Sequence, residues 1–274
     1  MMAGPIVVDS VPMHSIRQIN ALPEEHETKI YRLLIPEDLL SRYGIDPVTW
    51  KNADGVKLVD IEAAPGTSFL RIRVLPFPDF PDPLLQLELG DTGNHQLEIL
   101  LVIINDPHSE RFDVDRDWAG EPTKFGLMSR NLEEEERAMN AGLAPGQVRR
   151  GLRQTSRQLP LVESFAAGLG HDKYLANPLG YHNAIFLEWR GFNYIQGRRR
   201  MEWIHRDFQT GGDLFQKLDA STPFRQIEMA NTVRGRSWAI HDGILGEPWP
   251  ALEVRMFKRV GHHSGVCTFP DAVY

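Results

Sequence analysis

The order of hydrophobic patterns along the chain constrains its fold more than any other feature of the sequence. Segments 55–62, 67–75 and 83–90 show partial alternation of apolar and polar residues, as β-strands with one buried face do. Segment 95–104, HQLEILLVII, is the most apolar of these and is typical of a central strand. Helical patterns follow, and strand-like patterns return near the C-terminus. This order, without strict βαβ alternation, predicts an α+β fold.

We expect a mainly antiparallel sheet built from N-terminal and C-terminal strands, with a central helical insertion. We expect all of it to form a single composite domain, 1–274, long enough to bury about three quarters of its unfolded surface. The expected parts are an N-terminal arm over 1–27, a mainly β part over 28–118, a helical part over 127–220 and a mainly β part over 223–274. Further expected strands are 28–36, 236–243, 251–261 and 265–270.

Local signals set the ends of the helices expected in the middle of the chain. Asn131 is suited to an N-cap, and Gly142 to the end of the same helix. Pro145 is suited to the start of the next helix, which we expect Pro160 to interrupt. The helix after that ends at a C-cap on Gly170.

Composition limits the classes of partner. Hydrophobic residues make up 42% of the chain and charged residues 24%, as in ordinary globular proteins. The net charge of −7 argues against nucleic acid and anionic lipid. No apolar run approaches the roughly 18 residues of a membrane span, and no secretory signal opens the sequence. We therefore expect a cytoplasmic protein with no nucleic-acid or membrane partner. A small molecule or a protein is the expected partner, and a homo-oligomer stays open.

The single cysteine excludes an internal disulfide and a cysteine-based zinc or iron–sulfur site within one chain. Cys267 lies in the expected strand 265–270, so we expect a buried thiol.

Residues 178–208 hold an unusual density of aromatic residues, arginines and histidines. If this stretch were one helix, the apolar residues of 181–195 and those of 201–208 would lie on opposite sides of it. A single buried stripe is therefore incompatible with one straight helix.

Three arrangements resolve this conflict. The helix is buried on all sides, or it breaks near Gly191 or Gly197, or residues 184–196 form a hairpin. We favour a helix, a break and a second helix, and in all three arrangements 198–208 is expected to be helical.

Four side chains of this stretch suggest a metal site. Glu202 and His205 form a Glu-x-x-His half-motif, which offers a carboxylate and an imidazole from one side of a helix. The alternative is that Glu202 pairs with an arginine and His205 is partly packed. Glu188 falls on an apolar face, so an ionised carboxylate there needs an arginine, a metal or a shared proton. His182 lies on the edge of that face. Glu188, Glu202, His205 and His182 are thus the expected ligands of Fe, Mn or Zn.

Arginine runs in the second half of the chain suit anionic groups. Arg198 and Arg200, and also Arg234 with Arg236, can bind a phosphate, a carboxylate or acyl-CoA. No glycine-rich nucleotide loop accompanies them, and pairing with the chain's own acids is the interpretation that we favour for these runs. We take Arg198 and Arg200 as the expected cofactor-binding residues.

These residues support three functional hypotheses. The first is a metal-dependent enzyme that uses non-haem iron or manganese for redox chemistry on a small molecule. The second is a non-catalytic ligand-binding or protein-assembly factor that uses the aromatic and arginine-rich helical region. The third is a metal-free acid/base enzyme, in which Glu188 and His241 are the catalytic pair.

Overall fold

The computed structural model of the protein describes residues 4–124, 126, 128–249 and 253–274. The chain forms two compact units. The first unit comprises residues 1–108, 151–176 and 258–262, and the second comprises 109–150, 177–257 and 263–274. The single composite domain expected from the sequence stays a prediction.

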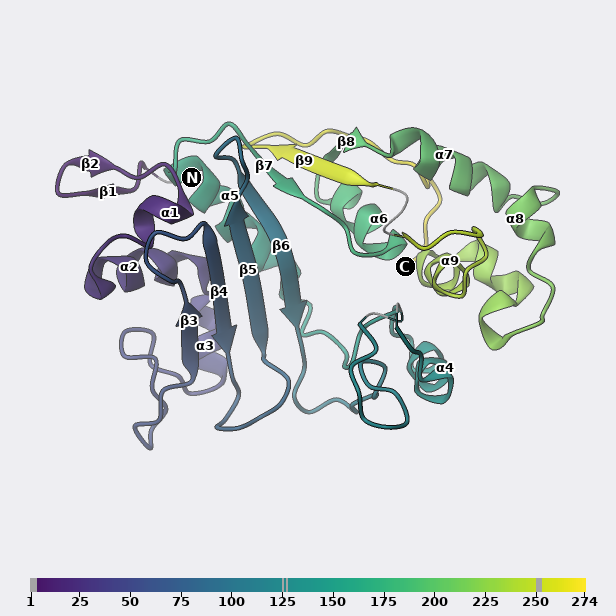
Figure 1. The fold of residues 1–274 in the computed structure, drawn as a ribbon, viewed down its shortest axis with the longest axis horizontal. Helices are drawn as coiled ribbons and strands as arrows, with labels where there is room; N and C mark the ends of the chain where they lie inside the picture. Colours follow the sequence, from purple (N-terminus) through teal and green to yellow (C-terminus); the bar gives the residue numbers. More distant parts are fainter. Residues whose placement is uncertain (1–3, 125, 127, 250–252) are drawn as a thin grey trace. The chain divides into compact units, whose positions relative to one another are not determined.

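The structure contains both helices and strands in each unit (Figure 1). The α-helices are α1 (Ile16–Ile19), α2 (Glu24–Tyr31), α3 (Glu37–Arg42), α4 (Leu132–Asn140), α5 (Thr155–Gly168), α6 (Tyr181–Trp189), α7 (Arg198–Asp207), α8 (Asp213–Gln216) and α9 (Val233–His241). The 3-10 helices are η1 (Arg32–Leu34), η2 (Pro223–Arg225) and η3 (Ile227–Asn231). The strands are β1 (Val7–Val8), β2 (Val11–Pro12), β3 (Val59–Glu62), β4 (Phe69–Val74), β5 (Leu85–Asp91), β6 (Leu97–Ile104), β7 (Lys173–Ala176), β8 (Asn193–Gln196) and β9 (Arg255–Arg259). None of the described helices is long and apolar enough to cross a membrane.

The sheet of the first unit has the strand order β3-β4-β5-β6-β7-β9, in which residues 258–259 of β9 belong to this unit. Strands β3 to β6 pair antiparallel, whereas β6 and β7 pair parallel. Helix α5 lies between β6 and β7 in the chain, as a parallel pair requires. In the second unit, β8 pairs antiparallel with residues 255–257 of β9. These observations confirm an α+β protein with a mostly antiparallel sheet.

Alternating side chains give the sheet of the first unit one buried face. Leu70, Ile72 and Val74 of β4 are fully buried, and every second residue of β5 is buried as well. On the other face, Arg71 pairs with Glu88 of β5 at 2.8 Å. Figure 1 shows α3 and α5 behind the strands. The buried face therefore forms the core with these helices, while the other face is polar.

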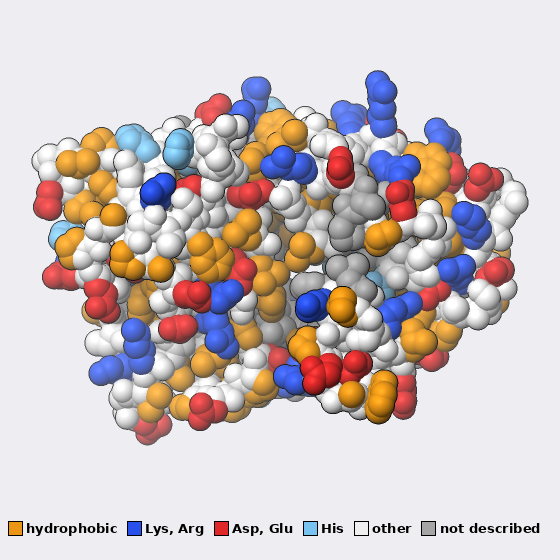
Figure 2. All heavy atoms as spheres, in the orientation of Figure 1, with side chains coloured by type: hydrophobic (Ala, Val, Ile, Leu, Met, Phe, Trp, Pro, Cys, Tyr) orange, Lys and Arg blue, Asp and Glu red, His pale blue; other side chains and the backbone are white. Residues whose placement is uncertain are grey.

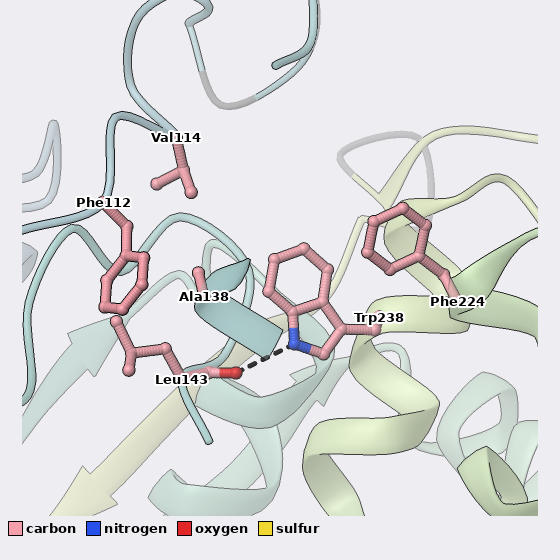
Figure 3. Close-up of a cluster of buried hydrophobic side chains, with 6 residues drawn as sticks. All are labelled: Phe112, Val114, Ala138, Leu143, Phe224 and Trp238. Carbon is pink, nitrogen blue, oxygen red and sulfur yellow. Dashed lines mark hydrogen bonds between the residues drawn. The ribbon is translucent and has the colours of Figure 1, made fainter. Parts of the chain in front are cut away.

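The second unit has a core cluster of its own (Figure 3). Its centre is Trp238 of α9, which stacks on Phe224 with ring centroids 5.2 Å apart. The indole N–H of Trp238 donates to the carbonyl oxygen of Leu143 at 2.8 Å, so the buried polar atom of the ring is satisfied. Phe112, from the loop before α4, and Ala138, from α4 itself, also belong to this cluster.

The central stretch 178–208 is a helix, a break and a second helix, as favoured from the sequence. The break lies between Gly191 and Gly197, which both have positive φ angles, of 86° and 96°. The short strand β8 fills the interval. Each turn needs glycine because side chains at φ near +90° are strained.

Two of the expected strands are helical in the structure. Segment 28–36 lies in α2, η1 and the residues after them, and segment 236–243 lies mostly in α9. Both were predicted wrongly because their aromatic and branched residues have high strand propensity, which tertiary packing overrides. In α9, Thr232 accepts a hydrogen bond from the N–H of Gly235 and thereby caps the helix.

The remaining corrections concern loops and helix ends. Residues 265–270 form no strand. Cys267 there is exposed, whereas its neighbours Thr268 and Phe269 are buried. The expected arm 1–27 contains α1, in which Ile16 and Ile19 are fully buried. Part of that segment is therefore core and not a loose lead-in.

Asn131 caps α4 as expected, and Gly142 follows its end with a φ of +81°. The next helix was placed wrongly, since α5 begins at Thr155 and passes through Pro160. Burial of Leu159, Val162 and Phe165 on both sides of the proline accounts for this, because apolar packing offsets the cost of one lost helix hydrogen bond.

Candidate functional site

Glu188 of α6 is buried, and its described hydrogen-bond partners are Tyr194 and Thr268. Its carboxylate accepts hydrogen bonds from the hydroxyl group of Tyr194, the hydroxyl group of Thr268 at 2.7 Å and the N–H of Thr268 at 2.8 Å. Burial raises the pKa of Glu188 above its ordinary value, although these donors favour the ionised form. Three neutral donor groups therefore bond to this carboxyl group.

His182, on the first turn of α6, is also buried. Its Nδ1 shares a hydrogen bond of 2.8 Å with the hydroxyl group of Ser237 in α9. Burial, with smaller contributions from His241 and Arg234, lowers the pKa of His182 to about 3. The imidazole is neutral at pH 7, which fits a hydrogen-bonded core residue.

The two residues of the Glu-x-x-His half-motif contact different groups. Glu202 pairs with Arg198 at 2.8 Å on the exposed side of α7, as in the alternative that we considered. His205 accepts a hydrogen bond at Nδ1 from the guanidinium of Arg236, at 3.1 Å. Burial and the nearby Arg236 lower the pKa of His205.

Within residues 4–124, 126, 128–249 and 253–274, no group of three or more His, Cys, Asp or Glu side chains is placed to hold a metal ion. Metal-dependent redox chemistry at Glu188, Glu202, His205 and His182 thus stays a prediction from the sequence, with Fe, Mn or Zn as its expected metal.

Arg236 is a buried cation that the sequence did not single out for this role. Its Nε donates to the carbonyl oxygen of Ala230 at 2.7 Å, and the guanidinium lies 3.6 Å from the ring centroid of Phe269 and 5.2 Å from that of Phe208. Burial lowers its pKa. Carbonyl and aromatic groups therefore take the place of the acid with which we expected it to pair.

His241 ends α9 and does not lie at a strand end as expected. Its Nε2 donates to the carboxylate of Glu135 at 3.1 Å. Arg130 donates to the other oxygen of Glu135, at 2.9 Å from Nε and 2.5 Å from Nη2. Burial alone would raise the pKa of Glu135, but the bonds from His241 and Arg130 outweigh it and lower the pKa.

The same network continues through Asp242. Its carboxylate accepts hydrogen bonds from Arg130 at 2.9 Å, Arg225 at 2.8 Å and the hydroxyl group of Thr222 at 2.9 Å. Burial opposes ionisation of Asp242, yet these bonds lower its pKa below the ordinary value. The network is consistent with a structural role, since every described member has a partner. The expected catalytic pairing of Glu188 with His241 stays a prediction.

The sequence reasoning missed Glu135 because it lies in the acidic run 133–136, which looks solvated. A signal was present, since Glu135 and Ala138 are three residues apart and share the buried face of α4. Thr268 carried no such signal, because it is 80 residues from Glu188.

The expected cofactor-binding arginines are engaged with acids of the chain itself. Arg198 pairs with Glu202, and Arg200 pairs with Glu247. An open depression of about 560 Å³ elsewhere in the second unit lies beside Met139, Thr222 and Met229. It contains none of the expected site residues.

A different feature of the first unit is the last part of β6. Strands β6 and β7 pair at Glu98–Leu175 and Ile99–Ala176, and β7 ends at Ala176. Residues 100–104 of β6 therefore have no strand partner on that side within the described part of the chain. These residues are apolar and partly exposed although β6 is an inner strand.

A β-bulge lies directly after the last of these pairs. Leu89 of β5 pairs with Ile99, whereas its neighbour Glu88 pairs with Leu101, so Leu100 is the extra residue of β6. Bulges bend a strand and leave the extra residue out of the ladder. The bulge thus marks the start of the segment of β6 that has no described strand partner on the β7 side.

The start of α5 meets the far end of this open edge. A Cβ on Gly151 would lie 3.1 Å from the carbonyl oxygen of Ile104, so the loop before α5 passes directly beside the end of β6. The first turn of α5 has no acidic residue and no side-chain cap. Its first intrahelical hydrogen bonds are made by the N–H groups of Arg157 and Gln158, so the N–H groups of Thr155 and Ser156 precede the ladder.

No known family model, curated protein or solved structure matches this chain. The functional assignment therefore depends on the geometry.

Proposed function

We propose that the open edge of β6 and the start of α5 bind a phosphopantetheine thioester, and that the protein is an acyltransferase. The single observation that carries this proposal is the edge of β6 that has no strand partner after a bulge, beside a helix start. In open sheets, ligands bind beyond the carboxyl ends of parallel strands where neighbouring strands separate.

The open edge suits an extended ligand that carries amides. Backbone N–H and C=O groups at an unpaired strand edge can hydrogen-bond to the amides of such a chain, in the way that they bind an added strand. Residues 100–104 cover about 13 Å at 3.3 Å per residue. Phosphopantetheine is an extended chain with two amides, a phosphate at one end and a thiol at the other. The partly exposed apolar side chains of β6 match the alkyl parts of that chain.

The start of α5 suits the phosphate end. The N-terminus of a 14-residue helix carries partial positive charge, and its free N–H groups bind phosphate. The absence of acids in its first turn and the exposed Arg153 just before it favour the same anion. Arg157 is paired with Asp38 at 2.6 Å and is less available.

With the phosphate at α5, the thioester lies toward Leu100. In this proposal the N–H of Leu100 donates to the thioester oxygen and stabilises the negative charge that forms on it during attack. The lone pair of an acceptor nucleophile attacks the carbonyl carbon, and the carbon–sulfur bond then breaks. The thiolate leaves with the electron pair of that bond and takes up the proton that the nucleophile loses. An amine or a hydroxyl group is the class of acceptor.

Binding of coenzyme A to the purified protein tests the proposal by isothermal titration calorimetry. We expect Ser156→Glu to weaken binding at least about tenfold, because it places a carboxylate beside the phosphate. Ser156→Gln is the matched control of the same size and is expected to change binding less than about threefold.

Folding does not confound this comparison. Ser156 is exposed, and an acid in the first turn favours the helix dipole, so the Ser156→Glu protein should be at least as stable as the control. If coenzyme A binds neither the wild type nor the control, or binds all three proteins equally, the proposed function is wrong.

A further inference from the structure

The second unit has an open depression of about 560 Å³ beside α4 and η3. Helix α4 contributes Glu136, Met139 and Asn140, which are three and four residues apart and therefore share one side of the helix. The other lining residues belong to the segment that holds η2 and the start of η3, and they include Glu228 and Met229. The volume falls within the range of roughly 300–1,000 Å³ that binding sites occupy.

The core of the second unit holds both sides of this depression. Figure 3 shows Ala138 of α4 and Phe224 of η2 on either side of Trp238. On the η2 side, the side-chain amide of Gln226 donates to the carbonyl oxygen of Thr222 at 2.8 Å. The depression therefore belongs to the folded core region of this unit and does not separate two loosely attached segments.

The carboxylates of this depression lack a counterion. Glu136 and Glu228 are exposed, and neither makes an ion pair with any residue in the described part of the chain. By contrast, Glu135 on another side of α4 pairs with Arg130 at 2.5 Å. None of the described residues that line the depression is a lysine, an arginine or a histidine. A positively charged partner therefore complements this surface.

Apolar side chains lie next to these acids. Met139 and Met229 line the depression and are only partly buried. Leu132, one helical turn before Glu136, is 56% exposed, and Ile227 of η3 is 53% exposed. Figure 2 shows several Asp and Glu side chains, with apolar side chains among them, over the part of the molecule where Figure 1 places α4 and the loop before it. Methionine adapts to apolar partners of different shape and is common at peptide-binding surfaces.

Other charged partners fit this surface less well. Nucleic acid and anionic lipid carry the same sign of charge as the two glutamates, which therefore repel them. Sites for small molecules enclose most of the ligand, whereas this depression is open and is flanked by exposed apolar residues. A peptide can fill the hollow and also cover its surroundings, as amphipathic segments do in apolar grooves.

We infer that the depression lined by Glu136, Met139, Glu228 and Met229 docks a basic peptide segment of a partner protein. An apolar side chain of the segment occupies the hollow, and lysine or arginine side chains next to it pair with the two glutamates. The inference is independent of the proposed function, because the depression belongs to the second unit and the acyltransferase site to the first.

The test uses a series of fluorescein-labelled heptapeptides, in which one central residue is flanked by lysines on both sides. The central residue is leucine, methionine or serine. Fluorescence anisotropy with the whole chain gives the dissociation constants at about 50 mM and about 200 mM salt. We expect the leucine and methionine peptides to bind at least about tenfold more tightly than the serine peptide, because only they bury an apolar side chain. All three affinities should fall as salt rises.

Neutral variants of the two glutamates test the charge of the depression. We expect Glu136→Gln and Glu228→Gln each to weaken binding of every lysine peptide at least about threefold at the lower salt concentration. Glutamine keeps the size of the side chain. Glu121→Gln is the matched control, because Glu121 is an exposed glutamate of the same unit that does not line the depression. It should change the affinities less than about 1.5-fold.

Met229→Gln tests the apolar part, since glutamine has nearly the length of methionine but carries a polar amide. We expect the leucine peptide to bind at least about fivefold more weakly and the serine peptide to change less than about twofold. Met229→Leu, which keeps an apolar side chain, should bind the leucine peptide within about twofold of the wild type. Unfolding of a variant would weaken both peptides equally, so the difference between them reports the depression alone.

Three results would overturn the inference. One is that the serine peptide binds as tightly as the leucine peptide, which would show attraction by charge without an apolar anchor. Another is that Glu121→Gln weakens binding as much as Glu136→Gln and Glu228→Gln do. The last is that spermidine alone binds as tightly as the leucine peptide and displaces it, which would assign the depression to a small amine. The proposed function is tested separately, by the binding of coenzyme A.

Discussion

Glu188 and His182 lie on the same helix, and burial favours the neutral form of each. The pKa of Glu188 is raised and that of His182 is lowered to about 3. The two residues therefore change stability with pH in opposite directions. Both bond to groups that can either donate or accept, since Tyr194, Thr268 and Ser237 offer hydroxyl groups.

We expect Glu188→Gln to become more stable than the wild type as pH rises. The folded protein binds the proton of Glu188 more tightly than the unfolded chain does. The contribution of Glu188 to the free energy of unfolding is therefore greatest below the ordinary pKa of 4.5. This contribution is lost as pH rises through the raised pKa of the folded protein. Glutamine keeps the bond from the N–H of Thr268, and the hydroxyl groups can turn to accept from its amide.

Urea unfolding of both proteins between pH 5 and pH 8 measures this difference. Glu188→Ala is the contrast, because it leaves the N–H of Thr268 unsatisfied. It should cost about 3 kcal/mol at pH 5 and less at higher pH, since alanine does not titrate. A glutamine variant that loses stability relative to the wild type with rising pH would show that ionised Glu188 is stabilising.

We expect His182→Asn to remove a loss of stability on acidification. In the unfolded chain His182 is protonated near pH 6.5, whereas in the folded protein it is protonated only near pH 3. The free energy of unfolding therefore falls as pH falls between these values. The loss between pH 7 and pH 5 is about 2 kcal/mol by linkage. Asparagine places its amide near the position of Nδ1 and retains a partner for Ser237.

Chemical unfolding at pH 7 and pH 5 gives the two free energies. The exposed His262 provides the control variant His262→Asn, which should leave the wild-type pH dependence unchanged. Equal losses in the wild type and in His182→Asn would contradict a buried neutral imidazole.

At the scale of elements, two glycine turns separate α6, β8 and α7. Gly191 has a φ of 86°, and a Cβ there would lie 2.9 Å from the Cα of His263. Gly211, after α7, has a similar φ of 89° but faces open space. Substitution of Gly211 therefore measures the cost of backbone strain alone, whereas substitution of Gly191 adds the cost of a steric clash with the backbone.

We expect Gly191→Ala to cost more than about 2 kcal/mol of stability and Gly211→Ala about 1 kcal/mol. Both alanine variants are destabilised because the residue has a left-handed backbone conformation. Only Gly191→Ala must also displace the chain at His263. Thermal and urea unfolding of the two variants give the comparison. Equal costs would mean that the segment at 263 yields without penalty.

At the scale of the whole molecule, ligand binding should appear as stability. If the first unit binds coenzyme A, a concentration one hundred times the dissociation constant should raise the free energy of unfolding by about 2.7 kcal/mol. Urea unfolding with and without coenzyme A measures the shift. Under the same concentration, Ser156→Glu should show a much smaller shift and Ser156→Gln nearly the full one.

Prediction from the sequence succeeded where neighbours in the chain decide the outcome. The break between Gly191 and Gly197 follows from two apolar faces that one helix cannot bury together. The cap at Asn131 follows from its own side chain, which accepts from the N–H of Glu134. The prediction of a strand at 236–243 failed, because strand propensity is weak compared with the packing of Trp238 in the core.

The candidate site could not be foreseen in the same way. Glu188 was identified as buried from its place on an apolar face. Its partner Thr268, however, is 80 positions away in the chain, and His241 is 106 positions from its partner Glu135. Such pairs leave no periodic trace in the sequence.

The sequence by itself determined the alternation that makes β4 and β5 strands, the broken helix at 178–208 and the burial of Glu188, because each depends on the period of side chains along the backbone. Only the tertiary structure decided that Leu100 is bulged, that the pairing of β6 with β7 ends at Ile99 and that Gly151 lies beside Ile104. The register of a strand depends on the backbone hydrogen bonds it makes with strands elsewhere in the chain, and every residue type offers nearly the same groups for them.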